Sequence, residues 1–233
     1  LSVLVLVFIV ASPTSMYIAF ERSLLPITLA VLGLGAQPER LSGSLYLWIY
    51  TIAASVPYFM IVLNRWSLWL FFLHGDIGAR EEIRNTATSL LVLRFLAKAP
   101  IYGLHLWLPQ THVEASAFGS SILAGILLKV GILGLIRVRG FLPVSMIPTL
   151  LVLRLLGGSI SSFMAICQTD IKSLIAYSSV THIAVSLCGA LAANIYGSFR
   201  SLLMVIGHGA VSRGMFSMAT VLYSTSGTRT LLV

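Results

Sequence analysis

The sequence predicts an all-α polytopic membrane protein, on the strength of three observations. Hydrophobic residues make up 58% of the 233-residue chain and charged residues only 9%, whereas a soluble domain has about 25% charged residues. The mean hydropathy is +0.97. Apolar runs of about 20 residues, long enough to cross a bilayer as helices, follow one another with short polar breaks. The composition therefore excludes a separate soluble domain of any size.

About seven of these runs qualify as membrane spans by length and composition. Residues 1–11 are too short for a span and are expected to form a short N-terminal stump, the end of a helix. This opening stretch has neither a basic n-region nor a small-residue cleavage site, so a signal peptide is not expected. Residues 64–86 are expected to form an interfacial segment and a polar loop. The predicted spans cover residues 15–34, 42–63, 85–108, 117–136, 143–166, 173–193 and 197–222.

The third span, residues 85–108, contains an unusual pair of residues. Lys98 stands two residues before Pro100 in the middle of apolar sequence. Proline removes a helical hydrogen bond and frees a carbonyl, and lipid supplies no partner for that carbonyl or for an ammonium group. Such a site persists only where it faces protein or water. We therefore predict a helix broken at Pro100, at a site that handles ions or protons.

Other ionisable residues lie inside the predicted spans, each on a different helix. An isolated charge at that depth costs several kcal/mol. Burial favours the neutral form of a lysine and a nearby carboxylate favours its charged form, so a lysine held between the two can exchange a proton when its partner moves. We therefore predict a proton relay of Glu21, Lys98, Lys129, His182 and His208.

Structural alternatives remain open for these residues. His182 and His208 could be satisfied core histidines, and Glu21 could pair with Arg22, although neighbours on a helix point apart. His105 and His112 are further relay candidates; the alternatives are that they anchor the membrane interface or satisfy loop carbonyls. Glu114 is expected at a helix N-terminus, where a carboxylate is favourable for dipole reasons alone.

The sixth span begins with a polar stretch, QTDIKS. Thr169 or Asp170 is expected to cap this helix, and Lys172 lies in its first turn, where a cation is unfavourable unless it is paired. Hydroxyl residues then lead into the membrane, where they could join helices or line a hydrated path. They are Ser173, Ser178, Ser179 and Thr181.

No cofactor or metal is expected in this chain. The sequence has no phosphate-binding glycine loop, haem-ligand pair, cysteine cluster or His-Glu-x-x-His motif. Cys167 and Cys188 are expected to be small core residues. The net charge of +8 is not concentrated in a basic cluster with interleaved aromatics, so nucleic acid is not an expected partner.

Four stretches carry a resemblance to a known family. They are ERSLLPI (21–27) with GAQPERL (35–41), KAPIYGLHLWLPQTHVEASAFGSSILAGILLKVGILGLIR (98–137), QTDIKSLIAYSSVTHIA (168–184) and IGHGAVSRGMF (206–216). In this order they resemble the antiporter-like membrane subunits of respiratory complex I, the proton-pumping NADH dehydrogenase of mitochondria. The resemblance implies an antiporter-like inverted-repeat helix bundle. Residues 1–138 would form the first repeat, with its broken helix at 85–108, and residues 139–233 an incomplete second repeat.

The resemblance also implies roles for the relay residues. Glu21 matches the family's membrane glutamate, Lys98 its partner at the helix break and Lys129 the central lysine. The family's fold forms two half-channels joined by a chain of charged residues. His182 and His208 match histidines on the route between these half-channels. Arginines stand where the family usually has neutral residues, and they either face acidic groups of a partner or mark a divergent subunit: Arg22, Arg94, Arg154 and Arg213.

The function that the resemblance implies is proton translocation in the membrane arm of complex I, in the mitochondrial inner membrane. NADH, FMN, iron–sulfur clusters and ubiquinone would be held by other subunits. The family's full-length members have more spans than this chain, so the implied partners are the bilayer, neighbouring antiporter-like subunits and a chain that supplies the remaining helices. The alternatives are a subunit of a cation/proton antiporter, or a structural remnant or half-subunit completed by another chain.

Overall fold

The computed structural model describes residues 18–19, 21–34, 40–63, 89–90, 92–192, 194–228 and 230. Within these ranges the only β pairing is one isolated bridge, between Asp170 and Thr230, so the all-α prediction is confirmed there. Residues 21–22 and 92–98 are helical. The other helices are α3 (Leu24–Leu34), α4 (Arg40–Leu63), α7 (Trp107–Glu114), α8 (Ala117–Ile122), the π-helix η1 (Leu123–Leu127), α9 (Leu128–Val138), the 3-10 helix η2 (Arg139–Phe141), α10 (Met146–Ile166), α11 (Ile171–Leu191) and α12 (Ile195–Ser226).

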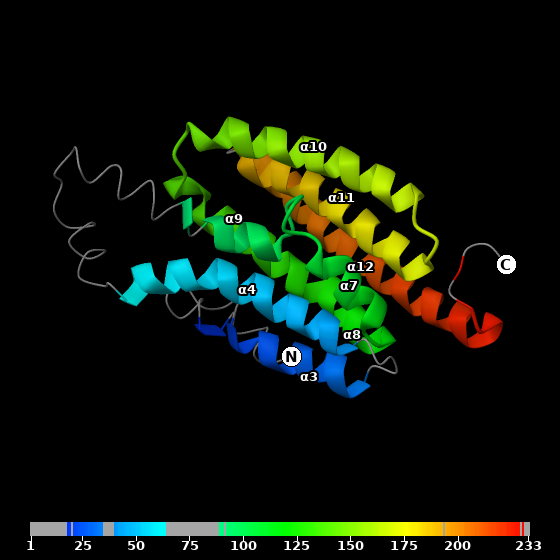
Figure 1. Cartoon of the computed structure of the whole chain (residues 1–233). Helices are drawn as coiled ribbons and strands as arrows, with labels where there is room; N and C mark the ends of the chain where they lie inside the picture. The colour runs from blue at the N-terminus through cyan, green and yellow to red at the C-terminus, as the bar shows by residue number, and fades with distance from the viewer. Residues whose placement is uncertain are drawn as a thin grey trace, which may run out of the picture.

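The helices form a bundle in which α7, α8, η1 and α9 occupy the middle (Figure 1). α3 and α4 lie on one side of this central group, and α10, α11 and α12 lie on the other. α11 packs between α10 and α12 and also contacts α7 and α9. Fully buried apolar side chains from the central helices, among them Trp107, Leu123 and Leu128, form the core.

Four helical segments of the described ranges are long and apolar enough to cross a membrane. They match the fourth to seventh predicted spans, and α4 matches the second. The predicted stump at residues 1–11 and the segment 64–86 lie outside the described residues, as does the start of the first span. The four segments are Ala117–Arg137, Met146–Ile166, Ile171–Leu191 and Ile195–Ser226.

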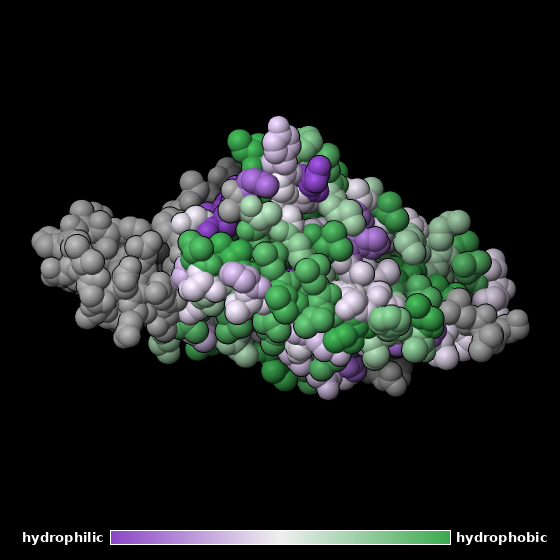
Figure 2. Space-filling view, turned by 90° about the horizontal axis from the view of Figure 1, so that it is seen from above, coloured by the Kyte–Doolittle hydropathy of each residue, from purple (hydrophilic) through white to green (hydrophobic). Residues whose placement is uncertain are grey.

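The outer surface of the bundle is apolar where lipid would contact it. Seen from the side on which α10 lies, hydrophobic residues are spread over much of the described surface, with more polar residues between them (Figure 2). The exposed side chains of α10 include Leu153, Leu155 and Phe163. Because a soluble protein rarely exposes many large apolar side chains close together, this face supports the assignment of a multi-pass membrane protein.

The third predicted span is interrupted beside Pro100. The helix of residues 92–98 ends there, Ala99 and Pro100 form a turn, and α7 begins only at Trp107. Proline has no N–H to donate to the carbonyl of Leu96, and the N–H of Ile101 reaches that carbonyl instead, at 3.2 Å. The helical piece after the break continues to Glu114, beyond the predicted end at residue 108.

The buried indole of Trp107 completes the hydrogen bonding at the break. Its Nε1–H donates to the carbonyl of Ala97 at 3.1 Å, and the side chain is fully buried. A backbone carbonyl released from a helix is costly at membrane depth unless a donor reaches it. The break is therefore held by specific contacts between its two helical pieces.

Candidate functional site

Three charged side chains meet beside the break. Oε1 of Glu21 lies 3.9 Å from Nζ of Lys98 and 3.7 Å from Nη2 of Arg94. The side chain of Lys98 is 1% exposed and that of Arg94 is 3% exposed, whereas that of Glu21 is 23% exposed. Residues four apart on a helix share one face, so the helix of residues 92–98 directs both cations at the same carboxylate. The structure thus brings the predicted pair together and adds a second cation.

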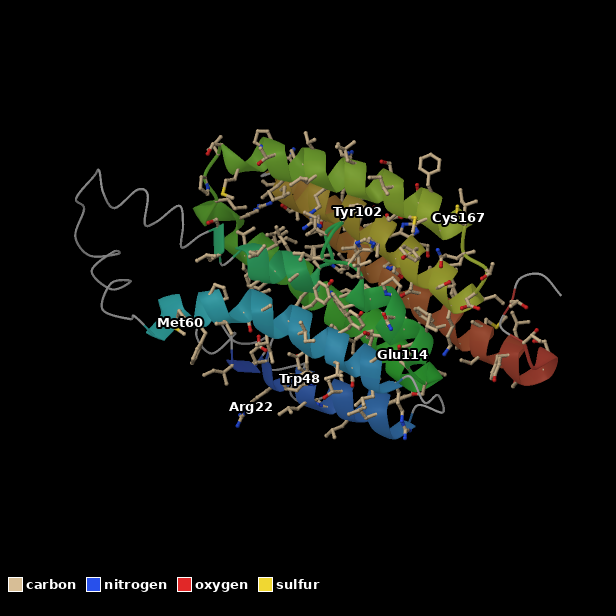
Figure 3. All side chains as sticks on the ribbon, in the orientation of Figure 1. Arg22, Trp48, Met60, Tyr102, Glu114 and Cys167 are labelled. Carbon is tan, nitrogen blue, oxygen red and sulfur yellow. The ribbon has the colours of Figure 1, made fainter. Side chains whose placement is uncertain are left out.

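The two arginines that flank the predicted pair in sequence differ in position. Figure 3 shows the side chain of Arg22 pointing away from the bundle, and this residue is exposed. Arg94 instead points inward to Glu21. Glu21 therefore finds its partners on another segment of the chain, and adjacency to Arg22 does not determine its pairing.

Lys129 lies near the start of α9, where the preceding segment is wound as a π-helix. Its Nζ donates to the carbonyl of Ala124 in η1, and the residue is 6% exposed. Gly209 of α12 lies against it: a Cβ at Gly209 would stand 3.2 Å from Cε of Lys129 and 3.7 Å from Nζ. The absence of a side chain at Gly209 thus lets α12 approach the buried ammonium group.

A second glycine, Gly125 of η1, also lies against α12. A Cβ at Gly125 would stand 2.7 Å from Cδ of Arg213, whose Nε donates to the carbonyl of Gly209 at 3.0 Å. Arg213 itself is exposed on α12, whereas Arg154 of α10 is 1% exposed. The three guanidinium nitrogens of Arg154 have no hydrogen-bond partner among the described residues.

The two predicted histidines on α11 and α12 face each other. The ring centroids of His182 and His208 are 5.0 Å apart and the planes are tilted by 35°. Nε2 of His208 is buried without a hydrogen-bond partner among the described residues. Since Lys129 lies over Gly209, the residue after His208, these contacts gather a lysine and two histidines from three helices.

His112 of α7 is fully buried against α12. Its ring stacks on that of Phe216, with centroids 4.5 Å apart and an interplanar angle of 6°. Neither of its ring nitrogens has a hydrogen-bond partner in the described part of the chain. A packing role would favour an apolar ring here, because a buried polar atom without a partner is costly. The sequence contained no signal for the contact with Phe216.

His105 has a different environment, within the loop of the break. Its Nδ1 accepts a hydrogen bond from the N–H of Gly103 at 3.2 Å. Its ring stacks on Tyr102 at 4.8 Å and meets Tyr177 edge-on at 6.0 Å. Gly103 has a φ of +94°, a conformation that favours glycine. These contacts hold the buried ring of His105 within the loop of the break.

Glu114 lies at a helix end, but not at the one expected. It is the last residue of α7, and its carboxylate serves the start of α4. Oε2 accepts from the N–H of Gly43 at 2.6 Å and Oε1 from the hydroxyl of Ser42 at 3.1 Å. A carboxylate at a helix N-terminus pairs with free N–H groups and with the helix dipole. Glu114 does pair with a helix N-terminus, as the dipole argument predicts, but that N-terminus belongs to α4, and Glu114 itself ends α7.

Lys172 is paired with a backbone carbonyl at the end of α7. Its Nζ donates to the carbonyl of Ala115 at 2.9 Å, at the end of α7, where carbonyls lack helical partners and attract cations. Asp170 is the N-cap residue of α11, although its side chain makes no capping hydrogen bond. A cation in the first turn of α11 is thus explained by its neighbour α7.

The hydroxyl residues of α11 bond mainly to carbonyls of their own helix. Thr181 also meets Ser161 of α10 at 2.9 Å between the two oxygens, which fits their role in joining helices.

Cys167 is exposed, so its assignment to the core was wrong, and Cys188 is partly buried. The described residues include no group of three or more His, Cys, Asp or Glu side chains that could hold a metal.

The chain matches a known transmembrane family over almost its whole length. The transmembrane family described as NADH:quinone oxidoreductase/Mrp antiporter matches residues 12–232. The chain belongs to this family. The described structure contains the buried charges and the interrupted helix that the resemblance implied.

Relatives within the family are similar over most of this chain. NADH-ubiquinone oxidoreductase chain 4 of Locusta migratoria is 43% identical over 225 residues, which cover 94% of this chain and 50% of the relative. The chain 4 of Rhipicephalus sanguineus is 36% identical over 243 residues, covering 100% of this chain and 54% of the relative. The chain therefore spans about half the length of these relatives.

Solved structures share the antiporter fold. A chain of respiratory complex I from Thermus thermophilus with bound NADH superposes with a TM-score of 0.85 at 24% identity, covering 97% of this chain and 50% of that one. A chain of the Mrp complex from Dietzia sp. DQ12-45-1b gives a TM-score of 0.80 at 16% identity, covering 95% of this chain and 43% of that one. These likenesses confirm the predicted antiporter-like bundle.

Proposed function

We propose that the chain is a proton-translocating subunit in the membrane arm of an NADH:ubiquinone oxidoreductase of the mitochondrial inner membrane. The observation that supports this most is the ion pair of Glu21 and Lys98 at an interrupted membrane helix. The similarity to NADH-ubiquinone oxidoreductase chain 4 of Locusta migratoria supports the choice of complex. Electron transfer would take place in other subunits, which would hold NADH, FMN, iron–sulfur clusters and ubiquinone.

In this proposal the break is the switch that loads and unloads Lys98. While Glu21 stays beside it, the ammonium form of Lys98 is stabilised by a counter-charge in a low-dielectric site. A movement of the break that separates the two groups leaves the ammonium without that support, and the proton departs. Because Trp107 ties the two helical pieces together through the carbonyl of Ala97, a shift of α7 would reach Lys98 directly.

The second group of residues would receive and pass on the proton. Lys129 lies against Gly209, next to His208, whose ring faces that of His182. Imidazole groups accept and donate protons through different ring nitrogens, so the pair supplies two successive stations. His112 is a further station, since both of its nitrogens lack hydrogen-bond partners among the described residues.

The assembly is part of the same proposal. Residues 1–138 would form the first antiporter-like repeat and residues 139–233 part of the second. The partners would be lipid, neighbouring antiporter-like subunits and a chain that supplies further helices. The apolar outer face of α10, with Leu153, Leu155 and Phe163 exposed, fits contact with lipid or with apolar helices.

A second candidate function is that of a cation/proton antiporter subunit. The superposition on the Mrp complex from Dietzia sp. DQ12-45-1b supports it, because the same fold serves both kinds of complex. In that case a sodium gradient, and not NADH oxidation, would drive proton movement. The two candidates share their buried charges and differ in the driving reaction.

The test compares the two driving forces in proteoliposomes that contain the purified complex. NADH oxidation with a soluble quinone should drive proton uptake, and an imposed sodium gradient should not. Glu21→Gln should lower the number of protons moved per NADH. Glu114→Gln is the matched control, since this carboxylate bonds the start of α4 and should leave the ratio unchanged. Proton movement driven by sodium alone would favour the second candidate.

A further inference from the structure

Two cations share one carboxylate oxygen at the break. Oε1 of Glu21 lies 3.7 Å from the guanidinium of Arg94 and 3.9 Å from the ammonium of Lys98. The relay described above uses Glu21 and Lys98 and assigns nothing to Arg94. Arg94 is nevertheless buried as deeply as the relay lysine, at a position where burial of a charge is costly without a compensating role.

The two cations differ in what they can do. A guanidinium keeps its proton under all conditions that a protein meets, whereas a lysine ammonium loses its proton readily in a buried site. Within the described residues, the charged groups that act on Lys98 are Glu21, from the neighbouring helical segment, and Arg94, one turn earlier on the same helix. Arg94 therefore supplies a fixed charge, and Lys98 an exchangeable one.

The fixed charge changes what happens when Lys98 becomes neutral. With Lys98 as its sole partner, the carboxylate of Glu21 would lose its counter-charge each time a proton departed, and a buried unpaired charge is strongly unfavourable. With Arg94 in contact, Glu21 remains paired after the proton has gone. Repulsion between the guanidinium and the ammonium, which lie on one helix face, also opposes the charged form of Lys98.

We propose that Arg94 is a positioning residue that holds the charge of Glu21, so that Lys98 can release its proton without leaving a bare carboxylate. The proposal rests on the proton-translocating function inferred above and assigns to one residue the step of proton release. Repulsion from the guanidinium of Arg94 would oppose the binding of a proton by Lys98 and would assist its release. Arg94 itself exchanges no proton.

The experiment measures protons moved per NADH as a function of pH, in the assembled complex carrying Arg94→Gln. Without the fixed charge, Lys98 should hold its proton more firmly, and release should require a lower proton concentration. The pH range of coupled transport should therefore move to higher pH by about one unit. Coupling that is lost at neutral pH should return at alkaline pH, which mere loss of packing would not produce.

Arg22→Gln is the matched control, because Arg22 is adjacent to Glu21 in sequence but exposed. Its pH profile should coincide with that of the unchanged complex. The proposal is overturned if the Arg94→Gln profile coincides with that of Arg22→Gln, or if coupling in Arg94→Gln is lost at every pH. If the unchanged complex moves no protons on NADH oxidation, the proposed function fails instead.

A second measurement covers the case in which Arg94→Gln alone does not assemble. Glu21→Gln leaves two cations without their shared carboxylate, and it should reduce the amount of assembled complex. Adding Arg94→Gln removes one of these cations and should restore at least part of that amount. A double variant that assembles less well than Glu21→Gln would show that Arg94 does not serve the charge of Glu21 and would overturn the proposal.

Discussion

The carboxylate of Glu114 accepts a 2.6 Å hydrogen bond from the backbone N–H of Gly43, and so joins the end of α7 to the start of α4. Thr111, one turn earlier on α7, donates to the carbonyl of Gly43 at 3.3 Å. Lys172 holds the carbonyl of Ala115 from the other side. The helical piece that follows the break is therefore fastened to both halves of the bundle.

Gly43→Ala should break this junction, because the added Cβ would overlap the carboxylate of Glu114. The loss of a charge-assisted hydrogen bond and the overpacking should together destabilise the protein by about 1–3 kcal/mol. Thermal unfolding of the assembled complex measures this. Gly33→Ala in α3 is the control, since its Cβ would meet nothing within 4 Å, and the two variants should differ. Equal stability of both would contradict the assigned junction.

Gly209→Ala should displace the ammonium group of Lys129 without unfolding the protein. The new Cβ would stand 3.2 Å from Cε of Lys129, close enough to push the flexible side chain aside. Protons moved per unit time should fall about tenfold, because transfer depends on the distance between donor and acceptor. Gly214→Ala on the same helix meets nothing within 4 Å and should transport normally. Identical rates in the two variants would argue against a relay through Lys129.

His112→Phe should separate packing from proton transfer. A phenyl ring can keep the stack on Phe216 and removes two buried nitrogens that lack partners in the described structure. The stability of the complex should be unchanged or rise by about 1 kcal/mol, while proton transport falls. Thermal unfolding and transport are measured on the same preparation. A less stable variant that transports normally would show that His112 is a structural residue.

Much of the fold and part of the site followed from the sequence, for identifiable reasons. Apolar runs fix where helices cross the membrane, so α10, α11 and α12 lie close to their predicted ranges. The high cost of a buried charge predicts that Glu21 and Lys98 each need a partner, and the family resemblance implied that they partner each other, as the structure shows. The spacing of Arg94 and Lys98 also held the signal for their shared face.

Apolar runs, the cost of buried charge and helix spacing do not predict contacts between segments that are distant in the sequence. Lys129 donates to the carbonyl of Ala124 in η1 and lies against Gly209 of α12, and residue periodicity does not encode these contacts. The partner of Glu114 lies 71 residues away, so its helix could not be named from local sequence. Cys167 is exposed at the end of α10 although its residue type favours burial. Each of these features is set by tertiary packing.

The most direct measurement is the number of protons moved per NADH by the assembled complex carrying Lys98→Met. Methionine fills a similar volume at this buried position but has no proton to exchange, so assembly should be retained. We predict that NADH oxidation continues while the number of protons per NADH falls. An assembled Lys98→Met complex with an unchanged number of protons per NADH would contradict the role of Lys98 in proton translocation.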